Sequence, residues 1–320
     1  MSPRLAYPRN HGAVLPAGLR QAGLSLVEVL VALVIGLVVI GAVMVNYLGT
    51  GFTGRSSSAL AQVTEDASVA LNVIRSHASL TGYGQPIQFN AGTGRLQLTL
   101  GAGRKVFGCD NSFSAANVGT LEELTCANGN GNDSIAVLYE ADESNSATVQ
   151  VAGVNRRADC IGSGIAPTPA AGTVPQHFRA EARFYINNAR TLLCQGNGGA
   201  ALAVAGTNLA TGPQPLAENI ESLQIRYGLS ADVPAGPGLP QRPGERVTRY
   251  VDAASIANVA QWNNVRALRV CVVARSENEV LDEATPYFGC FAAGPNDLIV
   301  PNDRRIYRAF TTTIMLQNRF

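Results

Sequence analysis

The sequence predicts an α+β fold in which a long N-terminal helix precedes a head of antiparallel strands. Residues 24–45 form an almost uncharged apolar run, and no proline stands between Pro16 and Pro86. Several later segments alternate apolar and polar residues. Apolar positions three and four apart are typical of helices, whereas strict alternation is typical of strands with one buried face. These observations predict one long helix and then a sheet.

The apolar run at 24–45 is long enough to cross a membrane. Its 22 residues would span about 33 Å as a helix, against a hydrocarbon core of ~30 Å. The preceding flank carries Arg4, Arg9 and Arg20 and no acid, so the positive-inside rule places the N-terminus in the cytoplasm. A cleaved secretory signal is the alternative. This alternative fits less well, because the apolar core of a secretory signal is usually about 7 to 15 residues long. The run at 24–45 also lacks a small-x-small cleavage site at its end.

Apolar residues at helical spacing continue after this run. They predict an amphipathic helix over about 55–80 that prolongs the membrane helix and packs on a sheet. Glycines within 49–54 interrupt the pattern and are expected to unwind or bend it, because each costs ~1 kcal/mol of helix stability. Glycines and a proline within 80–86 predict the helix end. The expected buried stripe is Leu60, Val63, Ala67, Leu71, Ile74 and Ala78.

Seven later segments read as strands of an antiparallel sheet. Along 220–227, one face is expected to carry residues 220, 222, 224 and 226, and the other the residues between and after them. Stretches rich in Gly, Pro and Ala at 161–176, 196–215 and 229–245 are expected to be surface loops. No internal repeat is present. The predicted strands are Ile135 to Glu140, Ala147 to Val151, Ala182 to Ile186, Thr191 to Cys194, Ile220 to Tyr227, Val265 to Ala274 and Ile306 to Leu316.

Composition excludes several partners. The 320 residues carry 24 Lys+Arg against 23 Asp+Glu, a net charge of +1, which offers no basic field for nucleic acid. Six cysteines without a C-x-x-C pair indicate an oxidising compartment rather than a metal site. The chain is therefore expected to fold, to be exported and to bind no nucleic acid.

The segment that opens the apolar run carries a specific motif. Gly23-Leu24-Ser25-Leu26-Val27-Glu28 follows Arg20 and resembles the signal of type IV prepilins and type II secretion pseudopilins. The resemblance implies that a prepilin peptidase cuts between Gly23 and Leu24 and methylates the new amine of Leu24. It also implies that Glu28 pairs with the terminal amine of a neighbouring subunit. The 23-residue leader is longer than is common in the family, and Leu24 stands where Phe is commonest.

A charged amine and a carboxylate four residues later are both costly in lipid, so their pairing across subunits would favour assembly. By this motif the chain divides into a leader at 1–23, a transmembrane helix at 24–48, a helix continuation at 49–80 and a head at 81–320.

Three strand segments in the head extend the resemblance. The segments 218–228, 262–270 and 310–319 resemble, in the same order, those of the PilW family of type IV pilus minor pilins. The loops at 87–134 and 161–215 match nothing in that pattern. The resemblance implies a type IV pilin-like fold and a fimbrial subunit that assembles or primes the pilus and serves twitching motility.

The six cysteines admit fifteen disulfide connectivities, so sequence alone does not decide the pairing. Pairing nearest neighbours is the simplest hypothesis, and each bridge would contribute ~3 to 4 kcal/mol in the chain-entropy model. Free buried thiols are the alternative. The hypothesis joins Cys109 with Cys126, Cys160 with Cys194, and Cys271 with Cys290.

No catalytic, cofactor or metal motif is present. H-E-x-x-H, G-x-S-x-G and the P-loop are all absent. His11 lies in the leader, His77 on the amphipathic helix and His177 in a loop, and none has a plausible catalytic partner. Asn128 to Asp133 resembles a calcium loop, but Asp133 occupies the position where that loop needs Gly. We therefore expect no enzyme, no cofactor and no metal.

The resulting hypothesis is a minor pilin held in the bacterial inner membrane, with a cytoplasmic N-terminus and a periplasmic head, that then enters the pilus fibre at its tip. Its expected partners are the prepilin peptidase, inner-membrane lipid, other minor pilins, the major pilin and a tip adhesin. Two alternatives remain open. One is a J-type pseudopilin of type II secretion, and the other is a tip adhesin or DNA-uptake module that binds through the unmatched loops.

Overall fold

The structure is a computed structural model that describes residues 23–90, 95–101, 103–129, 131–168, 176–199, 206–233 and 242–318. Two compact units divide the chain between Thr53 and Gly54. Helix α1 (Leu26–Ser79) begins in the first unit and ends in the second. The predicted leader lies outside the described residues except for Gly23.

Helix α1 shows no unwinding at Gly49–Gly54, where the sequence analysis expected an interruption. That expectation was wrong about unwinding. Helix propagation is cooperative, and long helical stretches on both sides of the glycines offset their individual cost of ~1 kcal/mol.

From Gly54 onward, α1 belongs to the second unit and buries one face there. The predicted positions Val63, Ala67, Ile74 and Ala78 are fully buried or nearly so. Leu60, however, is 38% exposed and Leu71 only partly buried. Ala59 and Ala70 lie at the contact instead. Small side chains let the helix backbone approach the strands closely. The predicted stripe was therefore wrong at Leu60, whereas Leu71 packs against the edge of the core.

The helix ends where its glycine and proline signals predict. After Ser79 the chain turns through Gly82, whose φ of +77° is the left-handed conformation that favours glycine. The N–H of Gly82 donates to the carbonyl of Leu138, 2.9 Å away. Strand β1 then begins at Pro86. The turn therefore ties the end of the helix to the sheet.

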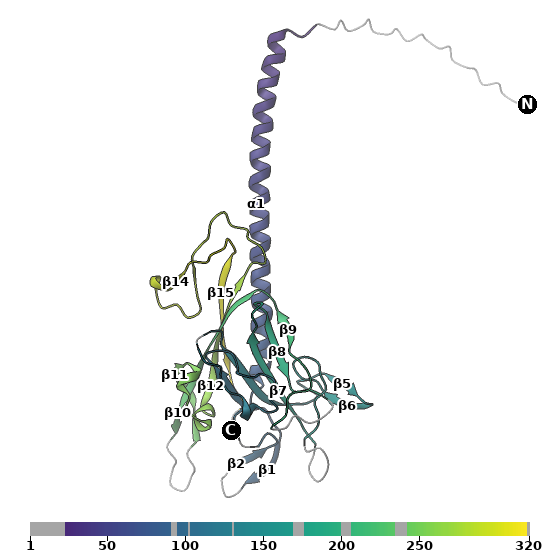
Figure 1. The fold of residues 1–320 in the computed structure, drawn as a ribbon, viewed down its shortest axis with the longest axis vertical. Helices are drawn as coiled ribbons and strands as arrows, with labels where there is room; N and C mark the ends of the chain where they lie inside the picture. Colours follow the sequence, from purple (N-terminus) through teal and green to yellow (C-terminus); the bar gives the residue numbers. More distant parts are fainter. Residues whose placement is uncertain are drawn as a thin grey trace, which may run out of the picture. The chain divides into compact units, whose positions relative to one another are not determined.

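Two antiparallel sheets form the head in the described part of the chain, where the sequence analysis expected one (Figure 1). The first has the order β3-β4-β7-β8-β9 and the second β11-β10-β12-β15. The first comprises β3 (Val106–Cys109), β4 (Ser134–Ala141), β7 (Phe178–Ile186), β8 (Leu192–Gly196) and β9 (Gln214–Ala217). The second comprises β10 (Ile220–Val233), β11 (Arg242–Val251), β12 (Val265–Arg275) and β15 (Tyr307–Met315).

Three small hairpins and four short helical turns complete the described elements. The hairpins pair β1 (Pro86–Asn90) with β2 (Arg95–Leu98), β5 (Thr148–Val151) with β6 (Val154–Arg157), and β13 (Tyr287–Phe288) with β14 (Leu298–Ile299). The turns are α2 (Val259–Trp262), η1 (Leu121–Glu123), η2 (Ala253–Ser255) and η3 (Pro295–Asp297).

The α+β class and all seven predicted strands are confirmed, although three details differ. The predicted loop at 196–215 is wrong at its end, because β9 begins at Gln214. The predicted loop at 229–245 is wrong at both ends, because β10 extends to Val233 and β11 begins at Arg242. Residues 169–175, 200–205 and 234–241 of the predicted loops lie outside the described residues. Ile220 is fully buried rather than on the polar face, because the register of β10 against β12 shifts between Ile220 and Ser222.

One hydrophobic core joins α1 to both sheets. It contains Val63 to Ala78 of the helix, residues on β3, β4, β7 and β8, and residues on β10, β12 and β15. Every residue of β4 is buried. Both faces of the first sheet are therefore covered, since a sheet with one wet face would leave alternate residues exposed.

The loop before η1 covers the outer face of the first sheet, and a buried ion pair holds it there. The guanidinium of Arg183 pairs with the carboxylate of Glu181 at 2.6 Å, and neither side chain is more than 5% exposed. Nη1 of Arg183 also donates to the carbonyls of Ala116 and Val118, at 2.7 and 2.5 Å. A charge this deeply buried needs all of these partners, so Arg183 fixes the loop before η1 over the sheet.

The asparagine and glycine segment before β4 joins the two sheets. The backbone N–H of Asp133 donates to the carbonyl of Leu223 at 2.8 Å, and its carboxylate accepts the N–H of Ile225 at 2.5 Å. The side-chain amide of Asn132 donates to the carbonyl of Glu221 and accepts the N–H of Leu223, both on β10. The predicted turn at 128–133 is thus a strap along the part of β10 that precedes its pairing with β11.

Asp133 is the titratable group of this strap. Burial raises the pKa of its carboxyl to about 8, against the opposing effect of the Ile225 N–H. At neutral pH the folded chain therefore holds a proton on Asp133 that the unfolded chain releases. A raised pKa contributes stability below the unfolded pKa of 3.8 and loses it as the pH rises towards 8.

We expect Asp133→Asn to flatten the pH dependence of stability between pH 6.5 and 8. Asparagine keeps an acceptor for Ile225 and has no proton to lose, so the variant should lack the wild type's fall of up to about 1.4 kcal/mol per pH unit. Denaturant unfolding of the detergent-solubilised chain measures this. The pKa of His77 is lowered from 6.5 to about 4, so His77 also adds a pH dependence near pH 6.5, but that contribution is the same in both proteins and cancels in the comparison. Equal slopes for the two proteins would contradict the assignment.

Candidate functional site

The predicted processing site lies immediately before helix α1. Gly23 to Ser25 have no helical structure, and Gly23 and Leu24 are exposed, Leu24 by 70%. Oγ of Ser25 accepts the backbone N–H of Glu28 at 3.3 Å, and the Ser25 carbonyl accepts the N–H of Val29 at 3.2 Å. Ser25 therefore caps the helix and leaves the Gly23–Leu24 bond in accessible, non-helical chain.

Ser25 is a functional residue for which the sequence analysis assigned no role. Its signal was present, because Ser-x-x-Glu before an apolar run is the capping-box pattern, and Ser25-Leu26-Val27-Glu28 fits it. Glu28 is the acidic residue of the first turn, where the helix dipole favours negative charge. The serine and the glutamate thus define where the helix starts.

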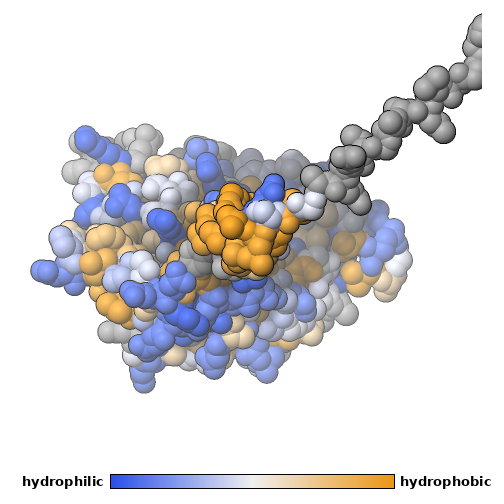
Figure 2. Space-filling model, turned by 90° about the horizontal axis from the view of Figure 1, so that it is seen from above, coloured by the Kyte–Doolittle hydropathy of each residue, from blue (hydrophilic) through white to orange (hydrophobic). Residues whose placement is uncertain are grey.

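The apolar span runs over Leu26–Tyr47, close to the predicted 24–48. An 18-residue stretch of this 22-residue span has a mean hydropathy of 2.9, and no residue of the span is buried in the structure. Figure 2 shows the hydrophobic side chains of this helix gathered in orange at its N-terminal end. Glu28 is the only Asp, Glu, Lys or Arg in the span. The segment is long and apolar enough to cross a membrane.

Cutting before Leu24 would place two opposite charges at the start of this span. The new amine would stand four residues before the Glu28 carboxylate, and a helical carboxylate in lipid costs about 2.5 to 3.5 kcal/mol on insertion scales. Contact with an opposite charge would lower the cost of placing the amine and the carboxylate in lipid. The arrangement can therefore do one thing chemically, which is to pair charges within an apolar helical assembly.

The head's cysteines are far in sequence from this site and have a separate role. The structure contains three disulfides, Cys109–Cys126, Cys160–Cys194 and Cys271–Cys290. In each, one half-cystine is a fully buried strand residue, on β3, β8 or β12. The other lies in a loop. Each bridge therefore ties a loop to a sheet, and this is the pairing of nearest neighbours.

The two histidines of the head lie apart, and each is packed into the fold. Nδ1 of His77 is 2.8 Å from Oη of Tyr139, and its ring is 5.7 Å from that of Phe184. Burial lowers the pKa of His77 to about 4, so its ring is neutral at physiological pH. His177 is buried in a β-bridge with Thr168. The part of the chain that the structure describes holds no group of three metal-ligating side chains. His11 lies outside the described residues.

Two family descriptions match the chain. Residues 18–44 match the prokaryotic N-terminal methylation motif, and residues 183–318 match type IV pilus-assembly protein W, PilW. A type IV-like pilin from Thermus thermophilus, TTHA1219, is 12% identical over 80% of this chain and 97% of its own, with a TM-score of 0.38. No curated protein sequence matches the chain.

The methylation motif on an apolar helix, followed by an antiparallel-sheet head, defines a type IV pilin-like protein. The motif implies processing by a prepilin peptidase, and the apolar helix is long enough to serve as a membrane anchor. Within this class, the resemblance to the PilW family of type IV pilus minor pilins is confirmed by the match over β7 to β15.

We expect peptide mapping of the non-reduced protein to find three linkages and no others. Trypsin separates Cys160, Cys194, Cys271 and Cys290 into four peptides. Cys109 and Cys126 share one tryptic peptide, but cleavage after Glu122 or Glu123 divides it. We therefore expect three disulfide-linked peptide pairs, each of which separates into its two peptides on reduction. A linkage between cysteines of two different pairs would contradict the structure.

Proposed function

We propose that the chain is a type IV pilus minor pilin that a prepilin peptidase cuts between Gly23 and Leu24 and methylates on Leu24. After processing, residues 24–48 hold it in the bacterial inner membrane with the N-terminus cytoplasmic and the head periplasmic. It then joins other minor pilins and the major pilin, in the complex at the fibre tip that primes assembly. A tip adhesin is a further partner on this proposal.

One observation carries the proposal. A capped helix start leaves the Gly23–Leu24 bond exposed, and Glu28 is the only Asp, Glu, Lys or Arg in the apolar span that follows. A soluble protein has no use for a predominantly apolar span of 22 residues of which none is buried. In a plain membrane anchor this first-turn carboxylate would help to cap the helix but would have no cation to pair with. A filament subunit uses both, because packing against other helices covers the apolar surface and neutralises the carboxylate.

The head supports a binding role rather than a catalytic one. Its described histidines are packed among aromatic and backbone groups, and its most deeply buried charges, those of Arg183 and Glu181, neutralise one another and hold a loop. Disulfides tie three loops to the sheets. We accordingly propose that the head works as a rigid contact surface and performs no reaction.

Mass spectrometry of the N-terminus tests the processing step. Protein from native membranes and sheared filaments should begin at N-methylated Leu24, and should retain residues 1–23 when the prepilin peptidase is absent. Gly23→Val should block the cut, whereas Gly36→Val, which adds the same side chain where nothing lies within 4 Å, should not. An intact leader in the wild type, or a cut elsewhere, would refute the proposal.

Glu28→Gln tests the assembly step. The variant should be cut and inserted normally, and its amount in sheared filaments should fall about tenfold or more, because a charged hydrogen-bonded partner is worth about 1.5 to 3 kcal/mol. Glu65→Gln, which neutralises an exposed acid of α1 within the head, is the matched control. Equal incorporation of both variants would show that the carboxylate has no role. Loss of twitching rather than of protein secretion on deletion would assign the filament as a pilus.

A further inference from the structure

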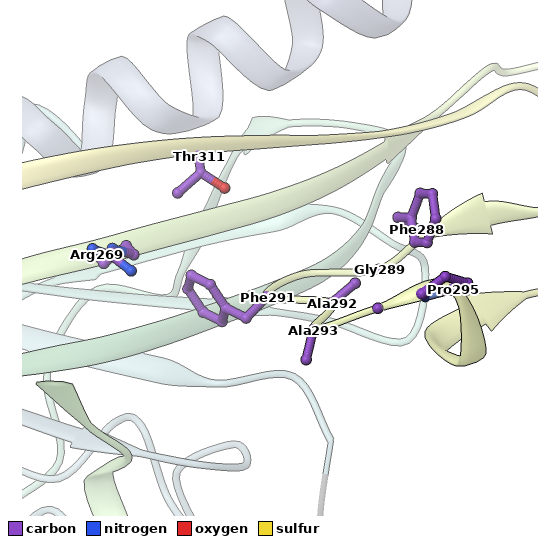
Figure 3. Close-up of a pocket in the computed structure, with 9 residues that line it drawn as sticks. Arg269, Phe288, Gly289, Phe291, Ala292, Ala293, Pro295 and Thr311 are labelled. Atoms are coloured by element: carbon purple, nitrogen blue, oxygen red, sulfur yellow. The ribbon is translucent and has the colours of Figure 1, made fainter.

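A hollow of about 600 Å³ lies on the outer face of the second sheet (Figure 3). Its floor includes Arg269 of β12 and Thr311 of β15. Its wall is the loop Gly289–Pro295, which belongs to the excursion between β12 and β15 that we call the flap, residues 276–306. Figure 3 shows Phe288 at one end of this loop and Phe291 on the side of Arg269.

The wall of the hollow is held in place by three separate contacts. The Cys271–Cys290 disulfide ties it to β12. The carboxylate of Asp297 accepts the backbone N–H groups of Ala293 and Gly294, at 2.6 and 3.2 Å. Phe291 has a φ of +57°, a conformation that non-glycine residues rarely adopt, and the guanidinium of Arg226 lies 5.4 Å from its ring centre. A side chain kept in such a conformation indicates a position that the surroundings enforce.

The charge at the floor of the hollow is not compensated. Arg226 and Arg269 face each other directly across β10 and β12, an arrangement that repels. Arg226 is neutralised by Asp252, 2.9 Å away. Arg269 instead lies over the ring of Tyr250 at 4.4 Å, and no acid within the described residues reaches ion-pair distance of it. None of the described residues that line the hollow is acidic, so Arg269 presents a charge that an external carboxylate would complement.

An apolar rim extends from the hollow along the flap. Phe288 is 50% exposed, and Leu298, Ile299 and Val300 are 44, 45 and 67% exposed. Phe288 pairs with Leu298 in the β13–β14 ladder, so these two side chains lie on one face of it, and Ile299 pairs with Tyr287 on the other. Aromatic residues and arginine are enriched in protein interfaces. The hollow is open to solvent, whereas small-molecule sites enclose most of their ligand. The occupant that fits is therefore a protein surface.

We propose that this hollow binds a segment of another protein of the pilus assembly, in which an Asp or Glu stands beside an apolar side chain. The carboxylate pairs with the guanidinium of Arg269, and the apolar side chain packs against Phe288 and Phe291. The proposal rests on the proposed function, because it names the chemistry by which the head recognises a partner in the assembly.

Site-specific crosslinking tests the contact in intact cells. A benzophenone amino acid replaces Ala292, an exposed residue of the wall, in the full-length chain. The same replacement at Val154, 57% exposed on β6, is the control. Light should give an adduct at 292 and not at 154, and mass spectrometry of the crosslinked peptide should find an Asp or Glu next to an apolar residue of a different protein.

Charge reversal then tests the role of Arg269. Arg269→Glu should reduce the adduct at 292 at least tenfold and leave the fold intact, since a carboxylate at 269 faces Arg226. Exchanging the partner's acid for Arg should restore the adduct with Arg269→Glu. Arg249→Glu, which reverses an exposed charge on β11, should leave the adduct unchanged.

Four outcomes would overturn the proposal. They are an adduct that Arg269→Glu leaves unchanged, an adduct with a segment that lacks a carboxylate, an adduct with lipid or with a second copy of this chain, and the absence of any adduct. Each of these outcomes is scored only on protein that begins at Leu24 and is recovered from filaments. Failure of the docking proposal is thereby distinguished from failure of the proposed function, which would appear as an intact leader or as absence from filaments.

Discussion

Helix α1 has an uncovered apolar surface over its first part and a face covered by the head over its last part. The rest of the structure depends on this difference. Over Leu26–Tyr47 every described apolar side chain is left for lipid or for other helices. From Ala59 to Ala78 one face must instead be covered by the head. The two sheets meet on this face and share one core with it. The small side chains of Ala59, Ala67, Ala70 and Ala78 allow the strands to approach.

The head is stabilised by connections between layers as much as by its core. The strap at Asp133 joins the two sheets through backbone hydrogen bonds to β10. Arg183 holds one loop over the first sheet, and three disulfides tie further loops to buried strands. Loops anchored in this way stay in one arrangement without secondary structure of their own, which is what a contact surface requires. The flap beside Arg269 is built on the same plan.

The processing segment and the docking hollow use electrostatics in the same way, although they lie in different parts of the chain. Within the described part of the chain, Glu28 is a carboxylate without a cation in an apolar span, and Arg269 is a guanidinium without an acid, beside exposed aromatic rings. An uncompensated charge next to apolar surface destabilises a free subunit and favours association with a complementary one. Both features are intelligible for a protein whose working state is an assembly.

The sequence by itself determined the helix, its apolar span, the processing motif and the strands with clear alternation, because each is a local pattern. Gly23, Leu24 and Glu28 are recognised through the resemblance of their segment to the prepilin signal, and the capping pattern at Ser25 was readable from its spacing. The tertiary structure alone decided that the strands form two sheets, that Ile220 is buried by a register shift and that Ala59 and Ala70 lie at the helix contact while Leu60 is exposed. It also decided that, among the described residues, no acid lies at ion-pair distance of Arg269. These features depend on residues far apart in the chain, and no local period of the sequence encodes which strand, loop or charge lies opposite another.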